Sequence, residues 1–336
     1  MLSSTLFKRR QAETEEILRD ALQRLQTGVG LEALNVAKKT SAAVDNLVQA
    51  NAQHKAANRR RKRAAMLQQH EVPEDQVTFF PDVAKLGRGG FGRVELVEYN
   101  GIMTAAKVMD LSDLDDDVSA TKRLKATFAK ELHAMVLLRS DYTVNVYGAI
   151  TKSPGRLVLL MEFMEGGDLR TLLGKDSALL EASFCRSLTL DIALGMEYLH
   201  SKKMIHGDLK SANILLNSNN QAKIADFGTA QTAGEYTTLG TQQRPGLTLK
   251  WSAPEVLNQE GMRLESDVYS FGILVWEIVT RKLPWAELVR PMDVVLEICR
   301  GRRPDVPADS PGILGQLMKL CWASSPADRP AFSKIV

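Results

Sequence analysis

The chain has 336 residues, of which 44% are hydrophobic and 25% charged, and its formal net charge is +3. The composition is typical of a globular protein, and the length exceeds the usual span of one domain, about 100–200 residues. No apolar run approaches the ~18–20 residues that span a bilayer, and the N-terminal sequence MLSSTLFKRRQAETEE lacks the apolar stretch of a secretory signal.

The excess positive charge belongs to the N-terminal part of the chain. Residues 1–75 contain 13 Lys and Arg against 9 Asp and Glu, whereas the remainder contains 30 against 31. The larger part therefore lacks the basic charge of a nucleic-acid-binding domain. The cysteines match no metal or disulfide framework, which predicts a reducing compartment and three buried structural thiols, Cys185, Cys299 and Cys321.

Residues 1–72 are rich in Ala, Leu, Gln, Glu and Arg and contain no proline, a composition that favours helix. A first helix with one apolar face is predicted from the spacing of Ile17, Leu18, Ala21, Leu22 and Leu25. It ends at the glycines Gly28 and Gly30. A second helix is predicted from about Leu31 to Gln69, stopped by Pro73, with its main apolar positions at Leu34, Val44, Leu47 and Val48.

This helical region allows three interpretations. It docks on the rest of the chain and regulates it, it self-associates and brings two chains together, or it is a weakly stable extension with a solvated face. The heptads are too irregular to predict a coiled coil. The basic run Arg59–Arg63 fits an exposed helix turn, a nuclear import signal or a patch for anionic lipid.

From about Val77 the pattern changes to short strands separated by glycine turns, in VTFF, GRVELVEY and MTAAKVMD. A helix is predicted at roughly 118–138, followed by further strands through RLVLLMEFM. After Gly167 the chain becomes mostly helical, as in LTLDIALGMEYLH and DVYSFGILVWEIVT. Strands followed by helices predict an α+β unit with a small sheet lobe and a larger helical lobe.

A glycine-rich motif lies between the first strands, in the residues Gly87, Arg88, Gly89, Gly90, Phe91, Gly92, Arg93 and Val94. Glycines let a backbone approach phosphate closely and present N–H groups to it. A dinucleotide-binding fingerprint would require a helix directly after the glycines. Because VELVEY reads as a strand, a flap over a nucleotide fits better, and a glycine hairpin without a ligand is the alternative.

Lys107 follows in a strand whose other residues are mostly apolar, AAKVMD. A cation in such surroundings needs an anionic partner. Two partners fit: the phosphates of ATP and Glu131, which lies in the predicted helix. Considered alone, Glu131 fits equally well as an exposed helix carboxylate.

The sequence HGDLKSANILL places Asp208, Lys210 and Asn213 in one short loop, and KIADFG follows with Asp226. Asp208 could accept the proton of a substrate hydroxyl, and Lys210 could neutralise charge on a transferring phosphoryl group. Asn213 and Asp226 carry oxygens that suit a metal ion. Phosphoryl transfer depends mostly on positioning and on neutralisation of charge by a metal, so these residue types fit that chemistry.

In this order and spacing, the motifs resemble those of eukaryotic protein kinases over roughly residues 78–336. The resemblance extends to the APE sequence at 253–255, Asp267 in SDVYSFG and Arg329 in ADRPAF. It implies the two-lobed kinase fold, with ATP and Mg²⁺ (or Mn²⁺) as cofactors and protein substrates as partners. The last helix of this fold would extend past Val336.

The resemblance also implies several residue roles. The hinge lies near 162–167, and the backbone of Glu162, Phe163 and Met164 would bind adenine. Met161 would be the gatekeeper and would narrow the pocket behind it. Val94 and Ala105 join the nucleotide-binding residues of the glycine loop. Met135, His206 and Phe227 would stack in the internal spine, and Glu255 would pair with Arg329.

The catalytic loop resembles the serine/threonine type, and in particular the tyrosine-kinase-like group, because Asp-Leu-Lys precedes Ser-Ala-Asn. Thr248 fits the same specificity. The sequence LTLKWSAPE, however, resembles that of tyrosine kinases, so dual specificity stays open. Gly207 stands where many kinases carry an arginine that clamps a phosphate on the activation segment. We therefore expect less dependence on phosphorylation within 229–252, where Thr237, Thr238 and Thr241 are available.

The predicted organisation is a helical region at 1–75 and a kinase domain at 76–336. The predicted function is ATP-dependent phosphorylation of Ser and Thr in proteins. The alternatives are a pseudokinase that acts as a scaffold, a dual-specificity or tyrosine kinase, and a small-molecule phosphotransferase. A cytoplasmic location is predicted, with nuclear import through Arg59–Arg63 as the alternative. We expect neither nucleic-acid binding nor a transmembrane segment.

Overall fold

The computed structural model describes residues 65–80, 86–89, 92–112, 117–175, 180–233, 249–308 and 310–336, and scattered positions between 13 and 61. By its contacts the chain divides into two units, Met1–Met66 and Leu67–Val336. The described residues of the first unit are helical, in agreement with the prediction for this region. Ile17, expected on an apolar face, is 52% exposed, and most of the other apolar positions named above lie outside the described residues.

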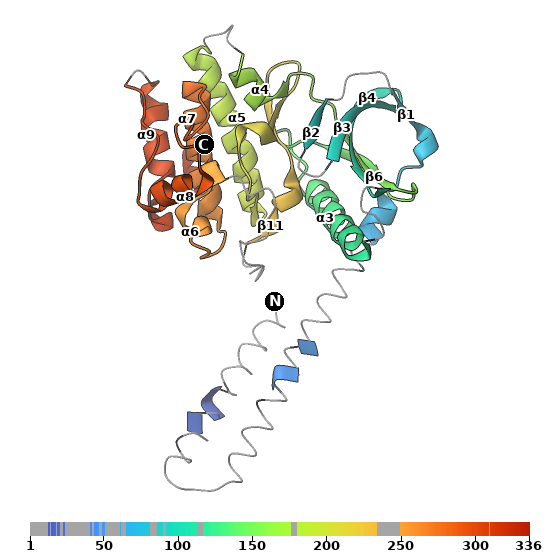
Figure 1. Cartoon of the computed structure of the whole chain (residues 1–336), viewed down its shortest axis with the longest axis horizontal. Helices are drawn as coiled ribbons and strands as arrows, with labels where there is room; N and C mark the ends of the chain where they lie inside the picture. The colour runs from blue at the N-terminus through green and yellow to red at the C-terminus, as the bar shows by residue number, and fades with distance from the viewer. Residues whose placement is uncertain are drawn as a thin grey trace. The chain divides into compact units, whose positions relative to one another are not determined.

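The second unit begins with a small lobe built on a curled antiparallel sheet (Figure 1). Its strands follow the order β1-β3-β4-β6-β5, and β2 pairs with β3. The bounds are β1 Val77–Phe79, β2 Gly87–Gly89, β3 Gly92–Tyr99, β4 Ile102–Asp110, β5 Val146–Ile150 and β6 Arg156–Glu162. Apolar side chains from one face form a compact core that includes Val97, Val108, Val158 and Leu160. This matches the strands predicted in this part of the sequence.

The segment before β1 adds a short pairing to the edge of this sheet. Glu71 bridges Ala149 of β5 in parallel, with hydrogen bonds from Val72 N to Ala149 O (2.8 Å) and from Ala149 N to His70 O (2.8 Å). A side chain at Gly148 would overlap Val72, since its Cβ would lie 2.3 Å from Cγ2. Gly148 therefore permits residues 70–72 to cover the β5 edge. The 3₁₀ turn η1, Glu74–Gln76, leads from there into β1.

Helix α3, Val118–Leu137, packs beside the sheet (Figure 1). Its N-cap is Asp117, whose carboxylate accepts hydrogen bonds from Ser119 N (2.8 Å) and Ala120 N (3.0 Å) and so satisfies two free helix donors. The buried face repeats at three- and four-residue steps through Phe128, Ala129, Glu131, Leu132, Ala134 and Met135. One charged residue, Glu131, is part of that buried face.

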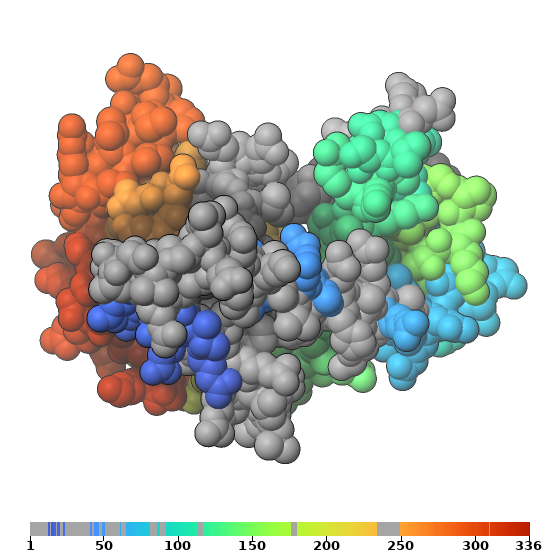
Figure 2. Space-filling model, turned by 90° about the horizontal axis from the view of Figure 1, so that it is seen from below, coloured from blue at the N-terminus to red at the C-terminus, as the bar shows by residue number. Residues whose placement is uncertain are grey.

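The larger lobe is helical around the central helix α7, Leu264–Thr280. Around it lie α4 Leu169–Leu173, α5 Ala182–Ser201, α6 Pro254–Leu257, α8 Pro291–Cys299, α9 Gly312–Cys321 and α10 Phe332–Ile335. Gly272 lets α9 approach α7 closely, because a Cβ there would lie 2.9 Å from the Cβ of Cys321. Figure 2 shows α3 in teal at the opposite end of the molecule from the orange and red α8 and α9.

Short strands and 3₁₀ turns also lie between β6 and α6 in the chain. They are β7 Gly167–Asp168, β8 Met204–Ile205, η3 Ser211–Asn213, β9 Ile214–Leu216, β10 Ala222–Ile224, η4 Phe227–Thr229, β11 Gln231–Thr232 and η6 Leu249–Trp251; η7 Pro326–Asp328 follows α9. Strands β7, β9 and β10 form one small sheet, and β8 pairs with β11.

The predicted two-lobed α+β fold is confirmed. The expectation of three buried thiols is wrong for one of them: Cys185 and Cys321 are buried, but Cys299 is exposed at the end of α8. No helix among the described residues has both the length and the apolar character to cross a bilayer.

Candidate active site

A buried ion pair links the sheet of the small lobe to α3. Side chains alternate between the faces of a strand; Ala106 and Val108 of β4 face the core, so Lys107 points the other way, toward α3. Its Nζ lies 2.6 Å from Glu131 Oε1, and the two residues are 5% and 1% exposed. The interpretation of Glu131 as an exposed helix carboxylate is therefore wrong.

Asp226 completes a three-charge cluster with this pair. The Nζ atom of Lys107 lies 3.3 Å from Asp226 Oδ1. Burial alone would lower the pKa of Lys107, but the carboxylates of Glu131 and Asp226 outweigh it and raise that pKa. Burial would likewise raise the pKa of Asp226, but the Lys107 cation outweighs it and lowers that pKa. Lys107 and Asp226 are thus held in their charged forms.

The segment from the end of β8 to the end of η3, here called the Asp208 loop, contains the other three predicted polar groups. Lys210 Nζ lies 2.7 Å from Asp208 Oδ2, and Asn213 Nδ2 donates to Asp208 O (2.7 Å) and Oδ2 (3.0 Å). The Asp208 side chain is 12% exposed. One carboxylate is thus fixed by two neighbours of its own loop while part of its surface stays accessible.

A buried carboxylate on α7 holds the start of this loop. Asp267 accepts hydrogen bonds from the backbone N–H groups of His206 (2.8 Å) and Gly207 (2.9 Å). The ring of His206 accepts from Asp208 N at Nδ1 (3.3 Å), which leaves Nε2 to donate to Ala225 O (3.0 Å). The loop backbone is thereby tied both to the central helix and to the segment that carries Asp226.

Two contacts bring the loop and the Asp226 segment together. Ala225 N donates to Asn213 O (2.9 Å), so the backbone segments that carry Asn213 and Asp226 lie side by side. Asp226 itself adopts a left-handed conformation, φ 58° and ψ 71°. Phe227 is buried against His206, with ring centroids 5.5 Å apart. Five side chains predicted from separate motifs therefore converge in two adjoining groups, Lys107–Glu131–Asp226 and Asp208–Asn213.

The described residues of the glycine motif form two paired antiparallel strands, as both the flap and the ligand-free hairpin predict. Gly87, Arg88 and Gly89 of β2 pair with Val94, Arg93 and Gly92 of β3. A side chain at Gly92 would collide with β4, since its Cβ would lie 2.1 Å from Val108 O. Gly90 and Phe91 lie outside the described residues. No helix follows the glycines, so the dinucleotide fingerprint does not apply.

Comparisons with known proteins agree with this geometry. The sequence profile of the family described as "Protein tyrosine and serine/threonine kinase" matches residues 82–336. The chain belongs to this protein kinase family.

The chain is similar to several named relatives. It is 33% identical to "Serine/threonine-protein kinase STY46" of Arabidopsis thaliana over 253 residues, 75% of this chain and 42% of that protein. It is 34% identical to "Serine/threonine/tyrosine-protein kinase HT1" of the same plant over 258 residues, 75% and 63% of the two chains. It is 33% identical to "Dual specificity protein kinase pyk3" of Dictyostelium discoideum over 266 residues, 79% and 18%. The chain thus spans less than half the length of STY46 and about a fifth of that of pyk3.

The predicted hinge of the kinase follows β6. The Glu162 side chain is held by Lys223, with Nζ 2.6 Å from Oε1, and by Asn145, which donates from Nδ2 to Oε2 (3.0 Å). Met161 pairs with Ala105 of β4, and Met164 is buried. The predicted nucleotide-binding residues Glu162 and Met164 thus lie at and just after the end of β6, and Ala105 lies beside them on β4.

The predicted pair between Glu255 and Arg329 is bidentate and buried. The distances are 2.7 Å from Nη1 to Oε1 and 3.0 Å from Nη2 to Oε2, and Ser266 Oγ also donates to Oε1 (2.6 Å). Burial would raise the pKa of Glu255, but the hydrogen bonds from Arg329 and Ser266 outweigh it and lower that pKa. The pair joins α6 to the chain after α9.

Glu277 is a site residue that the sequence analysis missed. This fully buried carboxylate of α7 accepts hydrogen bonds from Ser211 Oγ (2.5 Å) and Trp251 Nε1 (3.0 Å), and Arg170 of α4 lies 3.4 Å away. Burial raises the pKa of Glu277 despite these donors. It connects the Asp208 loop to η6, at the end of the activation segment. A single charged residue inside the apolar run GILVWEIVT was the available signal.

Gly207, the residue that replaces the arginine found in many kinases, has φ +79°. A Cβ at this position would lie 3.1 Å from Met262 Sδ and 3.6 Å from Thr229 O. The thioether of Met262 therefore covers the space beside Gly207. The candidate phosphorylation sites Thr237, Thr238 and Thr241 lie outside the described residues, and so does Thr248.

Proposed function

We propose that this kinase transfers the γ-phosphoryl group of ATP to serine and threonine hydroxyls of proteins. The observation that carries the proposal is the convergence of Lys107, Glu131 and Asp226 beside the loop of Asp208 and Asn213. These five side chains would supply the polar groups that phosphoryl transfer requires, and each of them is paired or hydrogen-bonded. This argues against a scaffold that lacks a working site.

The described residues fit a nucleotide-bound divalent cation. Asp226 and Asn213 offer a carboxylate and an amide oxygen, which are hard ligands suited to Mg²⁺ or Mn²⁺. No cluster of three or more His, Cys, Asp or Glu side chains in the described part of the chain could hold a metal unaided. A site of this kind fits a cation that takes its other ligands from phosphate and water. When bound, the cation would neutralise charge on the phosphates.

Each protein group then has a separate task. Lys107 would bind the α- and β-phosphates, and Glu131 would hold its ammonium in place. Asp208 would orient the substrate hydroxyl and accept its proton at the carboxylate, which Asn213 fixes. Lys210, 2.7 Å from Asp208, would move toward the transferring group and reduce its negative charge. The glycine hairpin β2–β3 would cover the nucleotide.

The relatives' names favour serine and threonine and also support a second candidate, dual specificity. STY46 is named a serine/threonine-protein kinase, whereas HT1 and pyk3 carry serine/threonine/tyrosine and dual-specificity names. The Lys210–Asp208 contact supports the serine/threonine form of the catalytic loop. Analysis of the phosphorylated amino acids decides between them.

The test uses the purified full chain with radiolabelled ATP, Mg²⁺ and a generic basic protein substrate. We expect labelled phosphoserine and phosphothreonine, loss of label in Lys107→Ala and Asp226→Asn, and no change in Lys319→Ala, an exposed lysine of α9. Thermal unfolding checks that each variant folds. Full activity in either site variant would refute the residue roles, and an inactive wild-type chain would favour the scaffold.

Residues 1–75 remain a separate proposal, as a regulatory or self-associating helical region. Analytical ultracentrifugation of the full chain over a range of concentrations tests self-association. The cytoplasmic location, with nuclear import through Arg59–Arg63 as the alternative, stays a prediction.

A further inference from the structure

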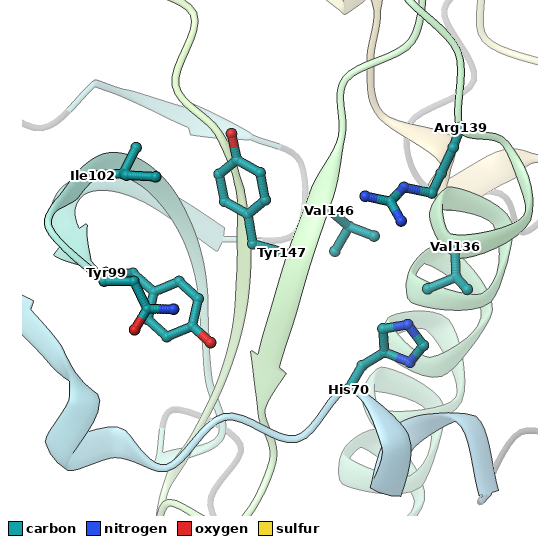
Figure 3. Close-up of a pocket in the computed structure, with 8 residues that line it drawn as sticks. His70, Tyr99, Ile102, Val136, Arg139, Val146 and Tyr147 are labelled. Carbon is teal, nitrogen blue, oxygen red and sulfur yellow. The ribbon is translucent and has the colours of Figure 1, made fainter.

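The small lobe contains a hollow that none of the proposed catalytic residues lines. It has a volume of about 410 Å³ and lies between the end of α3, strand β5, the β3–β4 turn and the segment that covers the β5 edge (Figure 3). Its lining residues are His70, Tyr99, Asn100, Ile102, Val136, Arg139, Val146 and Tyr147. This volume accommodates a small organic molecule.

One end of the hollow offers a positive charge. Arg139 follows α3 directly and is exposed, and its guanidinium points toward Val146 (Figure 3). Among the residues that the structure describes, none accepts a hydrogen bond from this guanidinium or pairs with it. His70 lies at the same end of the hollow as Arg139 and Val136 (Figure 3). A planar guanidinium with open donors binds a carboxylate well, because two parallel N–H groups match its two oxygens.

The other end is apolar and aromatic. Ile102 is 58% exposed and Tyr147 39% exposed, although both are large hydrophobic residues. Tyr99 lies next to Ile102 across the tight turn, in which Asn100 (φ 53°) and Gly101 (φ 75°) both adopt left-handed conformations. This pattern is that of a rigid two-residue hairpin, so the apolar wall is held in place. Flat aromatic ligands suit such walls.

The carboxylates of Glu162 and Glu165 disfavour an anionic group at the Tyr147 end of the hollow. Burial, together with the charges of Glu162 and Glu165, raises the pKa of the Tyr147 phenol. A carboxylate at that end would meet like charge, whereas Arg139 offers the opposite charge. The anionic group of a ligand therefore belongs beside Arg139, with its apolar body extending across Val146 toward Tyr99 and Ile102.

We propose that this hollow binds small aromatic carboxylates. The carboxylate pairs with Arg139, and the ring lies against Val146, Tyr99 and Ile102. The site is independent of the nucleotide and of the proposed phosphoryl transfer. Because Val136 and Arg139 lie at the end of the helix that carries Glu131, the bound molecule contacts an element of the candidate active site.

The test uses 6-fluoro-2-naphthoate and the full chain, with binding followed by fluorine NMR in the presence of saturating ATP and Mg²⁺. A ligand of this size is expected to bind with a Kd on the order of millimolar. Arg139→Gln should weaken it about tenfold, because it removes a charge-assisted hydrogen-bond pair. Ile102→Asn should weaken it about threefold through lost apolar contact.

Two controls isolate the charge. Arg123→Gln makes the same change on the first turns of α3, at a side chain that is 73% exposed, and should leave binding unchanged. The neutral analogue 6-fluoro-2-naphthalenemethanol should bind equally to the wild type and to Arg139→Gln. The proposal is overturned if naphthoate does not bind, if ATP displaces it, or if Arg139→Gln binds it as tightly as Arg123→Gln does.

Discussion

Replacing Glu255 with Gln removes the counter-charge of a fully buried guanidinium. Arg329 would keep its hydrogen bonds to the carbonyl oxygens of Glu265 (2.9 Å), Ala323 (2.9 Å) and Ser324 (3.2 Å), so it would remain partly satisfied. Its positive charge, however, would be buried without a partner. Breaking one side of a buried ion pair costs about 3–5 kcal/mol. Because Gln retains one acceptor oxygen, we expect a loss near the lower end, about 3 kcal/mol.

Thermal unfolding of the full chain measures this loss. In a domain of this size, each kcal/mol shifts Tm by about 2–4 °C, so Glu255→Gln should lower Tm by about 6–12 °C. The matched control is Glu287→Gln, which breaks an exposed pair with Arg302 at 3.3 Å. Exposed pairs contribute about 0–1 kcal/mol, so its shift should be within about 4 °C. Equal shifts in the two variants would show that the buried pair does not stabilise the large lobe.

Three further predictions follow from the site. The pKa of Glu255 is lowered on folding, so its contribution to stability is present in full above its ordinary value of 4.5 and is lost as pH falls further; the Tm difference between wild type and Glu255→Gln should therefore shrink on acidification, and a constant difference would contradict this. Glu277→Gln leaves one oxygen for three donors, Ser211, Trp251 and Arg170, so kcat should fall about tenfold through displacement of the catalytic loop; a lower Tm with unchanged kcat would mean a purely structural role. Simultaneous replacement by Ala of the activation-segment threonines Thr237, Thr238 and Thr241 should leave most activity in a radiolabelled ATP assay, because Gly207 offers no arginine for a phosphate there; complete loss would contradict that reasoning.

The sequence predicted those features that depend on residues close together in the chain. Lys107 had mostly apolar neighbours and required an anion, and the order of the kinase motifs identified Glu131 and Asp226 as candidates. The strands of the small lobe followed from glycine turns and β-branched runs, and β3, β4 and β6 lie within two residues of their predicted positions. Helix α3 likewise begins at its predicted residue.

Contacts between distant segments could not be predicted in this way. The pairing of Glu71 with Ala149 joins residues far apart in the chain, and three residues carry too little periodicity to signal a strand. Glu277 lies in a helix whose apolar pattern is continuous on both sides, so its partners Ser211 and Trp251 appear only after the loops fold against α7. The exposure of Cys299 depends on which face α8 turns outward.

The strip formed by His70, Glu71 and Val72 affects how the catalytic unit can be shortened. A protein trimmed to begin at residue 82, where the family similarity starts, would lose this strip and β1 as well. Ala149 would then have both an unpaired backbone N–H and an unpaired C=O on an open sheet border. Such borders recruit strands from other molecules and promote aggregation. A well-behaved fragment should start upstream of His70.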